Sequence, residues 1–427
     1  MISFLSDSVN ISLLIIFLIG VLICIYCRKR HELFSLVVLY YVIGILGSIL
    51  YYNLSDSVTS HQIEFERLAY CEGLLLVLAT PFLLIKKNKV LKWEDGILLS
   101  DLKFLTKFLA IISFLPFFYN LYQAIFNTNT TTLVSAYEGE SQTSAPFLIS
   151  LCIRTLRYFQ YIIGTLFFYF LTKGKPYKKY AYMALLSFLT LILVAYVGGG
   201  RGTMINQLNF LVINYFLFRN QIKENIKKRL NKALVIGMSI FVIGIMTITI
   251  ARFNNSYRTY ENNGFKPIVT WISLYVGQGP LEFSKQMYKS TVRTEGDNSF
   301  SLAKSILGKK TFKDNDERRE YWKDKQFIEN FIFYTLIGDL YSDLGWEYTI
   351  YFCLGMVLLM AYYIKSKNKQ LTFPKIVIFS LYFEWLTMGI MTNCFKVYYL
   401  QFYILTTIIL LLFLSCRYKL FNLKKNV

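Results

Sequence analysis

Charged residues are scarce in this sequence. They make up 17% of its 427 residues, whereas hydrophobic residues make up 55%, and the mean hydropathy is positive at +0.42. Soluble domains of this size rarely have such a composition. The sequence also lacks a Walker A loop, an HExxH motif, a GxSxG motif and the dinucleotide-binding fingerprint, so hydrolysis of a soluble nucleotide is not expected.

Cysteine and histidine are few and scattered. None of the 7 cysteines belongs to a CxxC pair, and all except Cys394 fall within apolar runs or at their ends, which leaves Cys394 as the one expected to face outward. This pattern supports neither a disulfide framework nor a zinc site. Of the 2 histidines, only His61 is expected outside the cytosol, and a lone loop histidine is more often solvated than catalytic.

Apolar runs dominate the rest of the chain. Many of them reach or approach the ~20 residues that a helix needs to cross the hydrocarbon core of a bilayer. The sequence therefore predicts an all-α polytopic membrane protein with about eleven transmembrane helices. The expected helices cover residues 10–27, 33–52, 68–85, 104–126, 147–172, 180–197, 203–218, 233–251, 346–364, 373–392 and 400–416.

The connections between these runs alternate in charge. Every second one is strongly basic, as in "KGKPYKK" and "RNQIKENIKKRLNK", which predicts a cytoplasmic location by the positive-inside rule, with the N-terminus outside and the C-terminus inside. Three parts follow: residues 1–250 with eight helices, 251–345 as a large external loop, and 346–427 with three helices and a basic tail. Within the loop, "TWISLYVGQGPLEFSKQMYKS" is interpreted as a surface helix or a lid.

Two arginines lie inside a predicted span. Arg154 and Arg157 are three positions apart and share a helical face. Because a guanidinium in hydrocarbon costs roughly 2.5 to 3.5 kcal/mol, such residues usually line a polar cavity. The alternative is that both side chains extend to the outer membrane surface.

A glycine-rich turn places another arginine at the same outer level. In "VGGGRG" the chain must reverse within about five residues, and Arg201 stands beside the start of the next helix. Backbone N–H groups there, together with the guanidinium, predict an anion site, whereas a simple hairpin whose arginine meets lipid phosphates is equally compatible. Arg252 and Arg258 open the long loop, and a phosphate or pyrophosphate would suit all of these side chains.

Two aspartates precede the predicted span at residue 346. In "GDLYSDLG", Asp339 and Asp343 lie four positions apart and share one face if the segment is helical. Such carboxylates act as a base or bind sugar hydroxyls in some proteins, and in others they cap a helix or pair with arginines. The sequence leaves these alternatives open.

Two segments resemble one known family. "VGGGRGTMI" resembles the glycine-rich arginine turn of the oligosaccharide repeat-unit polymerases, the Wzy family, and "NFIFYTLIGDLYSDLGWEYTIYFCLG" resembles that family's segment after its long external loop. The plan of many spans with one large external loop also fits. The motifs are short, but the shared plan covers nearly the whole chain.

The resemblance implies a GT-C-type fold and a polymerase in the bacterial cytoplasmic membrane whose active site faces the periplasm or the cell exterior. Such enzymes transfer a glycan from undecaprenyl pyrophosphate to a lipid-linked repeat unit and need no nucleotide sugar, metal or other cofactor. By motif, Arg201 and Asp343 match the family, with Asp339 as an alternative base. By position, Arg154, Arg157 and Arg252 stand where the family has basic residues.

Other functions remain open from the sequence. A flippase of the Wzx type handles the same lipid-linked units but usually lacks a long external loop. The related O-antigen ligases have a histidine in that loop, which this sequence lacks. The expected partners are the lipid-linked donor and acceptor, membrane lipids and a regulator of chain length; the net charge of +20 serves orientation and lipid contact rather than nucleic-acid binding.

Overall fold

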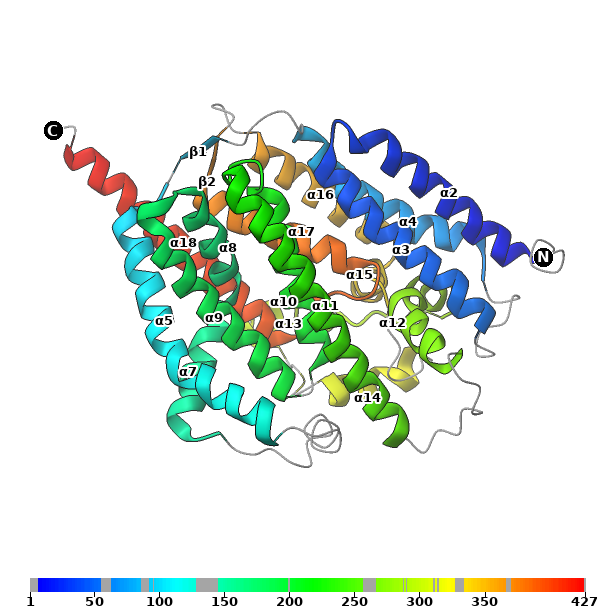
Figure 1. The fold of residues 1–427 in the computed structure, drawn as a ribbon. Helices are drawn as coiled ribbons and strands as arrows, with labels where there is room; N and C mark the ends of the chain where they lie inside the picture. Colours follow the sequence, from blue (N-terminus) through cyan, green and yellow to red (C-terminus); the bar gives the residue numbers. More distant parts are fainter. Residues whose placement is uncertain are drawn as a thin grey trace. The chain divides into compact units, whose positions relative to one another are not determined.

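The structure is a computed structural model that describes residues 7–54, 63–85, 92–94, 96–127, 145–198, 200–255, 266–286, 288, 290–309, 312, 315–326, 334–365 and 370–425. Helices make up nearly all of these residues, which confirms the all-α class (Figure 1). The described β structure is one two-stranded ladder of β1 (Lys92–Glu94) and β2 (Gln370–Thr372).

The chain divides into two compact units by its internal contacts. Unit 1 comprises residues 1–91, 260–370 and 382–402, and unit 2 comprises 92–259, 371–381 and 403–427. The division thus falls inside α17 (Phe373–Gly389) and α18 (Tyr398–Lys425). These units are discontinuous, whereas the three parts expected from the sequence follow one another along the chain.

Unit 1 holds most of the N-terminal helices and the segment between residues 266 and 364. Its helices are α2 (Ser8–Arg28), α3 (Glu32–Leu54), α4 (Phe65–Ala79) with the 3-10 turn η2 (Thr80–Leu84), α12 (Lys266–Lys285), α13 (Ser301–Ile306), α14 (Asn315–Gln326), α15 (Leu336–Leu344) and α16 (Trp346–Ile364).

Unit 2 is a second helical bundle. Its helices are α5 (Leu99–Tyr122) with the π-turn η3 (Gln123–Asn127), α7 (Phe147–Tyr158), α8 (Gln160–Thr172), the 3-10 turn η4 (Lys175–Tyr177), α9 (Lys178–Val197), α10 (Arg201–Phe218) and α11 (Glu224–Asn255). α5, α8 and α9 pack side by side (Figure 1), and Thr165 of α8 donates to the Asn214 side chain of α10 at 3.0 Å.

Seven helices of the described residues are long and apolar enough to cross a membrane, so the protein is membrane-embedded. They cover Ser8–Arg28, Glu32–Leu54, Phe65–Leu84, Leu99–Asn127, Lys175–Val197, Trp346–Ile364 and Tyr398–Leu423. Each of the other four segments predicted as spans is also helical. The total of eleven crossings stays a prediction.

One predicted span is not a single helix. Phe159, with φ −107° and ψ 6°, ends α7 and separates it from α8, so the prediction of one continuous helix over 147–172 is wrong at this residue. The break divides a segment that exposes both of its arginines from one in which residues 160–170 are all buried. Because of the break, α7 and α8 can be oriented independently, so that α7 exposes its arginines while α8 is buried.

The segment expected to form a surface helix or a lid packs inside unit 1. It forms α12, in which residues 277–284 are buried, and it lies against α3. The two backbones meet where Gly277 faces Gly47, and the Ser48 hydroxyl donates to the Gly277 carbonyl at 2.7 Å. Small residues permit this close approach between apolar helices.

Candidate functional site

Helix α15 positions the two aspartates that the sequence singled out. The Thr335 hydroxyl caps its N-terminus by accepting from the Gly338 N–H at 3.0 Å. Gly345 ends the helix with φ +83°, and a Cβ there would lie 2.8 Å from Arg293 Nε. Residues 336–343 are all buried, so Asp339 and Asp343 sit on a helix whose ends are fixed and which is covered on every side.

Asp339 forms a buried ion pair. It is 3% exposed, and Lys396 Nζ lies 3.7 Å from its Oδ2. That oxygen accepts no hydrogen bond from the described residues. Burial raises the pKa of Asp339 above its ordinary value, while the positive charges of Lys396 and Arg318 act in the opposite direction.

The two cations whose charges act most strongly on the pKa of Asp339 come from distant parts of unit 1. Lys396 belongs to the connection between α17 and α18, and Arg318, on α14, is only 6% exposed. Burial lowers the pKa of each of these two groups, and the charge of Asp339 opposes that shift. We call Asp339, Lys396 and Arg318 the charged cluster; the sequence interpretation missed its two cations because they are far from Asp339 along the chain.

Asp343 is also buried, but its carboxylate is bound by a loop. Thr294 donates its hydroxyl to Oδ1, the backbone N–H groups of Gly296 and Asn298 donate to the same oxygen at 3.1 Å each, and the Ser299 N–H donates to Oδ2 at 2.6 Å. Burial raises the pKa of Asp343 to about 6, although the hydrogen bonds favour the ionised form. The group is therefore ionised at neutral pH.

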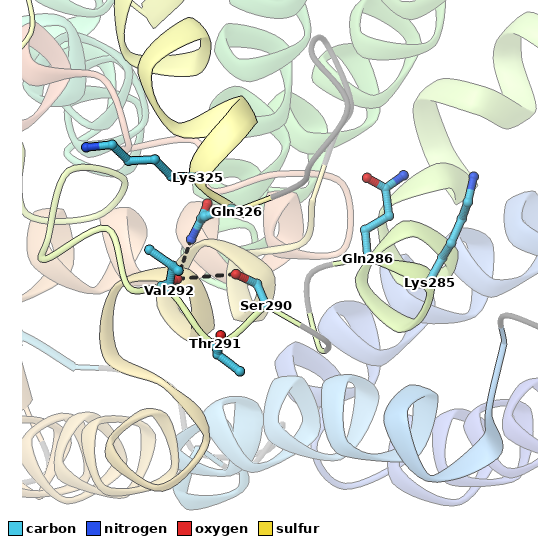
Figure 2. A pocket seen from close by; sticks show the side chains of 7 residues that line it. All are labelled: Lys285, Gln286, Ser290, Thr291, Val292, Lys325 and Gln326. Atoms are coloured by element: carbon cyan, nitrogen blue, oxygen red, sulfur yellow. Dashed lines mark hydrogen bonds between the residues drawn. The ribbon is translucent and has the colours of Figure 1, made fainter.

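A pocket of about 270 Å³ lies near this loop and is drawn in Figure 2. Its lining residues are Lys285, Gln286, Ser290, Thr291, Val292, Lys325 and Gln326. The Gln326 amide donates to the Val292 carbonyl at 2.7 Å and to the Ser342 hydroxyl at 3.0 Å, while Lys325 Nζ lies 3.7 Å from the Tyr321 ring. The lining residues include no carboxylate, and the Gln326 amide and the Ser290 hydroxyl already donate to the Val292 carbonyl.

The arginines predicted to bind an anion belong to unit 2. Arg154 and Arg157 are both exposed on α7. Arg201 is the first residue of α10 and Arg252 lies in α11, while Arg258 is outside the described residues. That these arginines bind one anion together therefore remains a prediction.

The turn before Arg201 has the short length that the sequence predicted. α9 ends at Val197, and the Gly200 N–H donates to the Ala195 carbonyl at 2.9 Å before α10 begins. Gly198 and Gly200 have φ angles of −77° and −82°, so these two do not need the left-handed conformation. A Cβ on Gly198 would lie 3.3 Å from the Val194 carbonyl oxygen, which makes close packing the reason for a glycine there.

All seven cysteines are free, and Cys394, which was expected to face outward, is buried. It lies on the same connection as Lys396, where the chain packs into unit 1 rather than projecting from it.

Comparisons with models of protein families, with curated proteins and with solved structures find no match for this chain.

Proposed function

We propose that this membrane protein is a polysaccharide polymerase of the Wzy type, a membrane glycosyltransferase that joins lipid-pyrophosphate-linked oligosaccharide units outside the cytosol. The observation that carries the proposal is Asp339, a buried carboxylate beside Lys396 with one oxygen that accepts no hydrogen bond from the described residues. Such an oxygen is suited to take a proton from a hydroxyl group of a substrate. The GT-C fold and eleven spans belong to the same proposal.

The proposed step is a glycosyl transfer that needs no nucleotide. The acceptor hydroxyl forms a bond to the anomeric carbon while Asp339 takes its proton. The bond between that carbon and the pyrophosphate oxygen breaks, and the electron pair leaves with the lipid pyrophosphate. Positive groups that are already in place stabilise the growing negative charge without reorganising. By the resemblance, the candidates for that role are Arg154, Arg157, Arg201, Arg252 and Arg258.

The first prediction tests Asp339 directly. Purified protein, given a lipid-pyrophosphate-linked repeat unit and no nucleotide, is expected to produce a ladder of longer glycans on a gel. Asp339→Asn keeps the shape of the side chain but cannot take a proton, so the rate is expected to fall roughly 100-fold or more. Asp324→Asn, at an exposed position of α14, is the matched control and should retain full activity. Normal polymerisation by Asp339→Asn would refute the assignment.

A second function, transport of the lipid-linked unit, is favoured by two carboxylates inside the apolar helices. Glu72 of α4 and Glu384 of α17 are 4% and 2% exposed, and one oxygen of each accepts no hydrogen bond from the described residues. Buried acidic groups at membrane depth often relay protons in transporters. Sealed vesicles distinguish the two functions: transport that depends on a pH gradient and is lost in Glu72→Gln, without any glycan ladder, would replace the polymerase.

A further inference from the structure

The loop that binds Asp343 has an unusual backbone. Glu295 has φ +53° and is the one described residue other than glycine with a positive φ, and Gly296 follows with φ +91°. Backbone N–H groups in a turn can point toward one place, where they bind an anion. In this protein the anion is the Asp343 carboxylate, so an intramolecular charge maintains a conformation that a glutamate otherwise rarely adopts.

The same loop holds the helix that carries Arg318. The Asp297 carboxylate forms an ion pair with Lys304 and accepts a hydrogen bond from Trp322 Nε1 at 3.0 Å. The Asp297 backbone carbonyl accepts from the Arg318 guanidinium at 3.2 Å. Residue 297 therefore fixes two points of α14, one of which is the arginine of the charged cluster.

The far side of the loop is fixed as well. The Gln401 side chain accepts from the Leu302 N–H at 3.0 Å and donates to the Ser299 carbonyl at 3.0 Å and to the Phe395 carbonyl at 3.0 Å. Phe395 adjoins Lys396 in the chain. Both cations of the charged cluster are therefore attached, by short hydrogen-bonded connections, to the segment that Asp343 folds.

We propose that Asp343 is a positioning residue: it folds residues 294–299, and this segment in turn holds the Arg318 guanidinium and the chain that carries Lys396, the ion-pair partner of Asp339. The role at Asp339 rests on the proposed function, whereas the folding of the loop does not. Both oxygens of Asp343 are engaged by the loop, since Oδ1 accepts three donors and Oδ2 accepts the Ser299 N–H. We therefore assign the role of proton acceptor to Asp339.

Hydrogen exchange tests the loop independently of any activity, and this is the second prediction. In Asp343→Asn the backbone N–H groups of residues 296, 298 and 299 lose a charged acceptor, so peptides covering 294–302 should exchange roughly 10-fold faster. Peptides of α14 should also exchange faster. Asp339→Asn is the matched control on the same helix and should leave the 294–302 exchange unchanged. Thr294→Val keeps the charge of Asp343 and removes one hydrogen-bond donor to it, so it should increase the exchange rate by a smaller factor. This variant tests the loop if Asp343→Asn does not fold.

Activity then separates a positioning role from a catalytic one. In Asp343→Asn, kcat should fall, and the acid limb of the pH profile of kcat/KM should persist but move to higher pH, because Asp339 still sets it while Lys396 and Arg318 are no longer held in place. The proposal would be overturned if hydrogen exchange of residues 294–302 were unchanged in both Asp343→Asn and Thr294→Val. It would also be overturned if the acid limb of kcat/KM disappeared in Asp343→Asn but persisted in Asp339→Asn, because Asp343 would then be the base. If no variant of the protein polymerises any repeat unit, the proposed function fails, and the exchange result still decides the role of Asp343 in the loop.

Discussion

At the scale of single residues, the donors around a buried carboxylate decide what it can do. Asp339 and Asp343 are 3% and 5% exposed and lie on one helix. Asp343 accepts four hydrogen bonds from one loop, whereas Asp339 has a lysine near one oxygen and no hydrogen bond to it from the described residues. A carboxylate oxygen that accepts no hydrogen bond is the better placed to receive a proton from a ligand. A carboxylate whose two oxygens both accept hydrogen bonds from one loop is suited to hold that loop.

The third prediction concerns the pH at which Asp339 becomes active. Burial raises its pKa and Lys396 opposes that shift, and a base must be ionised, so activity is lost as the pH falls through the pKa of Asp339. Lys396→Gln removes the opposing charge, the pKa rises further, and the acid limb of kcat/KM should move to higher pH by roughly one unit or more. Lys309→Gln, at an exposed position, should leave the limb in place. A limb that moves to lower pH would contradict this assignment.

The sequence indicated part of this site and omitted the rest for a physical reason. The spacing of Asp339 and Asp343 on a short helix before a long apolar run can be read locally. Arg318 and Lys396 cannot, because neither lies on α15 and the packing of unit 1 brings their charges close enough to act on Asp339. In the sequence, Arg318 stands in a mixed-charge stretch and Lys396 in a short polar connection, both of which are typical of solvated charges.

At the scale of elements, the packing of α12 on α3 depends on the absence of side chains. A Cβ on Gly277 would lie 2.0 Å from the carbonyl carbon of Gly47 and 2.1 Å from the Ser48 nitrogen. No rotation of a side chain relieves such a contact, because the atoms it meets belong to the backbone. The two helices would have to separate, and the hydrogen bond from Ser48 to Gly277 would lengthen.

The fourth prediction follows from this contact. Gly277→Ala should destabilise the protein by about 1 to 3 kcal/mol, the usual cost of overpacking, and thermal unfolding in detergent should show a lower midpoint. Gly355→Ala on α16 is the matched control, because a Cβ there has no atom within 4 Å. It should leave the midpoint unchanged or raise it slightly, since alanine favours helix formation. Equal midpoints for the two variants would show that α3 and α12 do not approach as described.

Helices were the most predictable elements, and the reason is that apolar runs of this length have few other stable conformations in a membrane. The run 346–364, for example, coincides with α16 (Trp346–Ile364). The break at Phe159 was not predicted, because no proline or glycine marks it, although Arg154 and Arg157 before it and Gln160 after it make this part of the chain more polar than the run that follows. The burial of α12 was also missed: its Gly279 and Pro280 favour an interrupted surface segment, yet α12 runs unbroken from Lys266 to Lys285.

At the scale of the whole molecule, the distribution of basic residues should fix how the chain crosses the membrane. α9 is one of the seven candidate spans and α10 is not, and the turn of residues 198–200 lies between them. The connections on either side, "KGKPYKK" and "RNQIKENIKKRLNK", are basic and are expected in the cytoplasm. Both can be cytoplasmic only if α10 crosses the membrane as α9 does.

The fifth prediction decides whether α10 is a span. In a variant whose native cysteines are replaced, single cysteines at the exposed positions 175, 202 and 223 are labelled with a membrane-impermeant maleimide. Gly202→Cys should react in intact cells, because the positive-inside rule puts the glycine turn outside, whereas Lys175→Cys and Lys223→Cys should react only after the membrane is opened. If Lys223→Cys reacts in intact cells, both ends of α10 lie outside and the helix does not cross the membrane. The positive-inside rule would then fail here, because the first turns of this 18-residue helix are too polar to enter the bilayer. The total of eleven crossings would then fall, and Arg201 would begin a helix that lies outside the membrane.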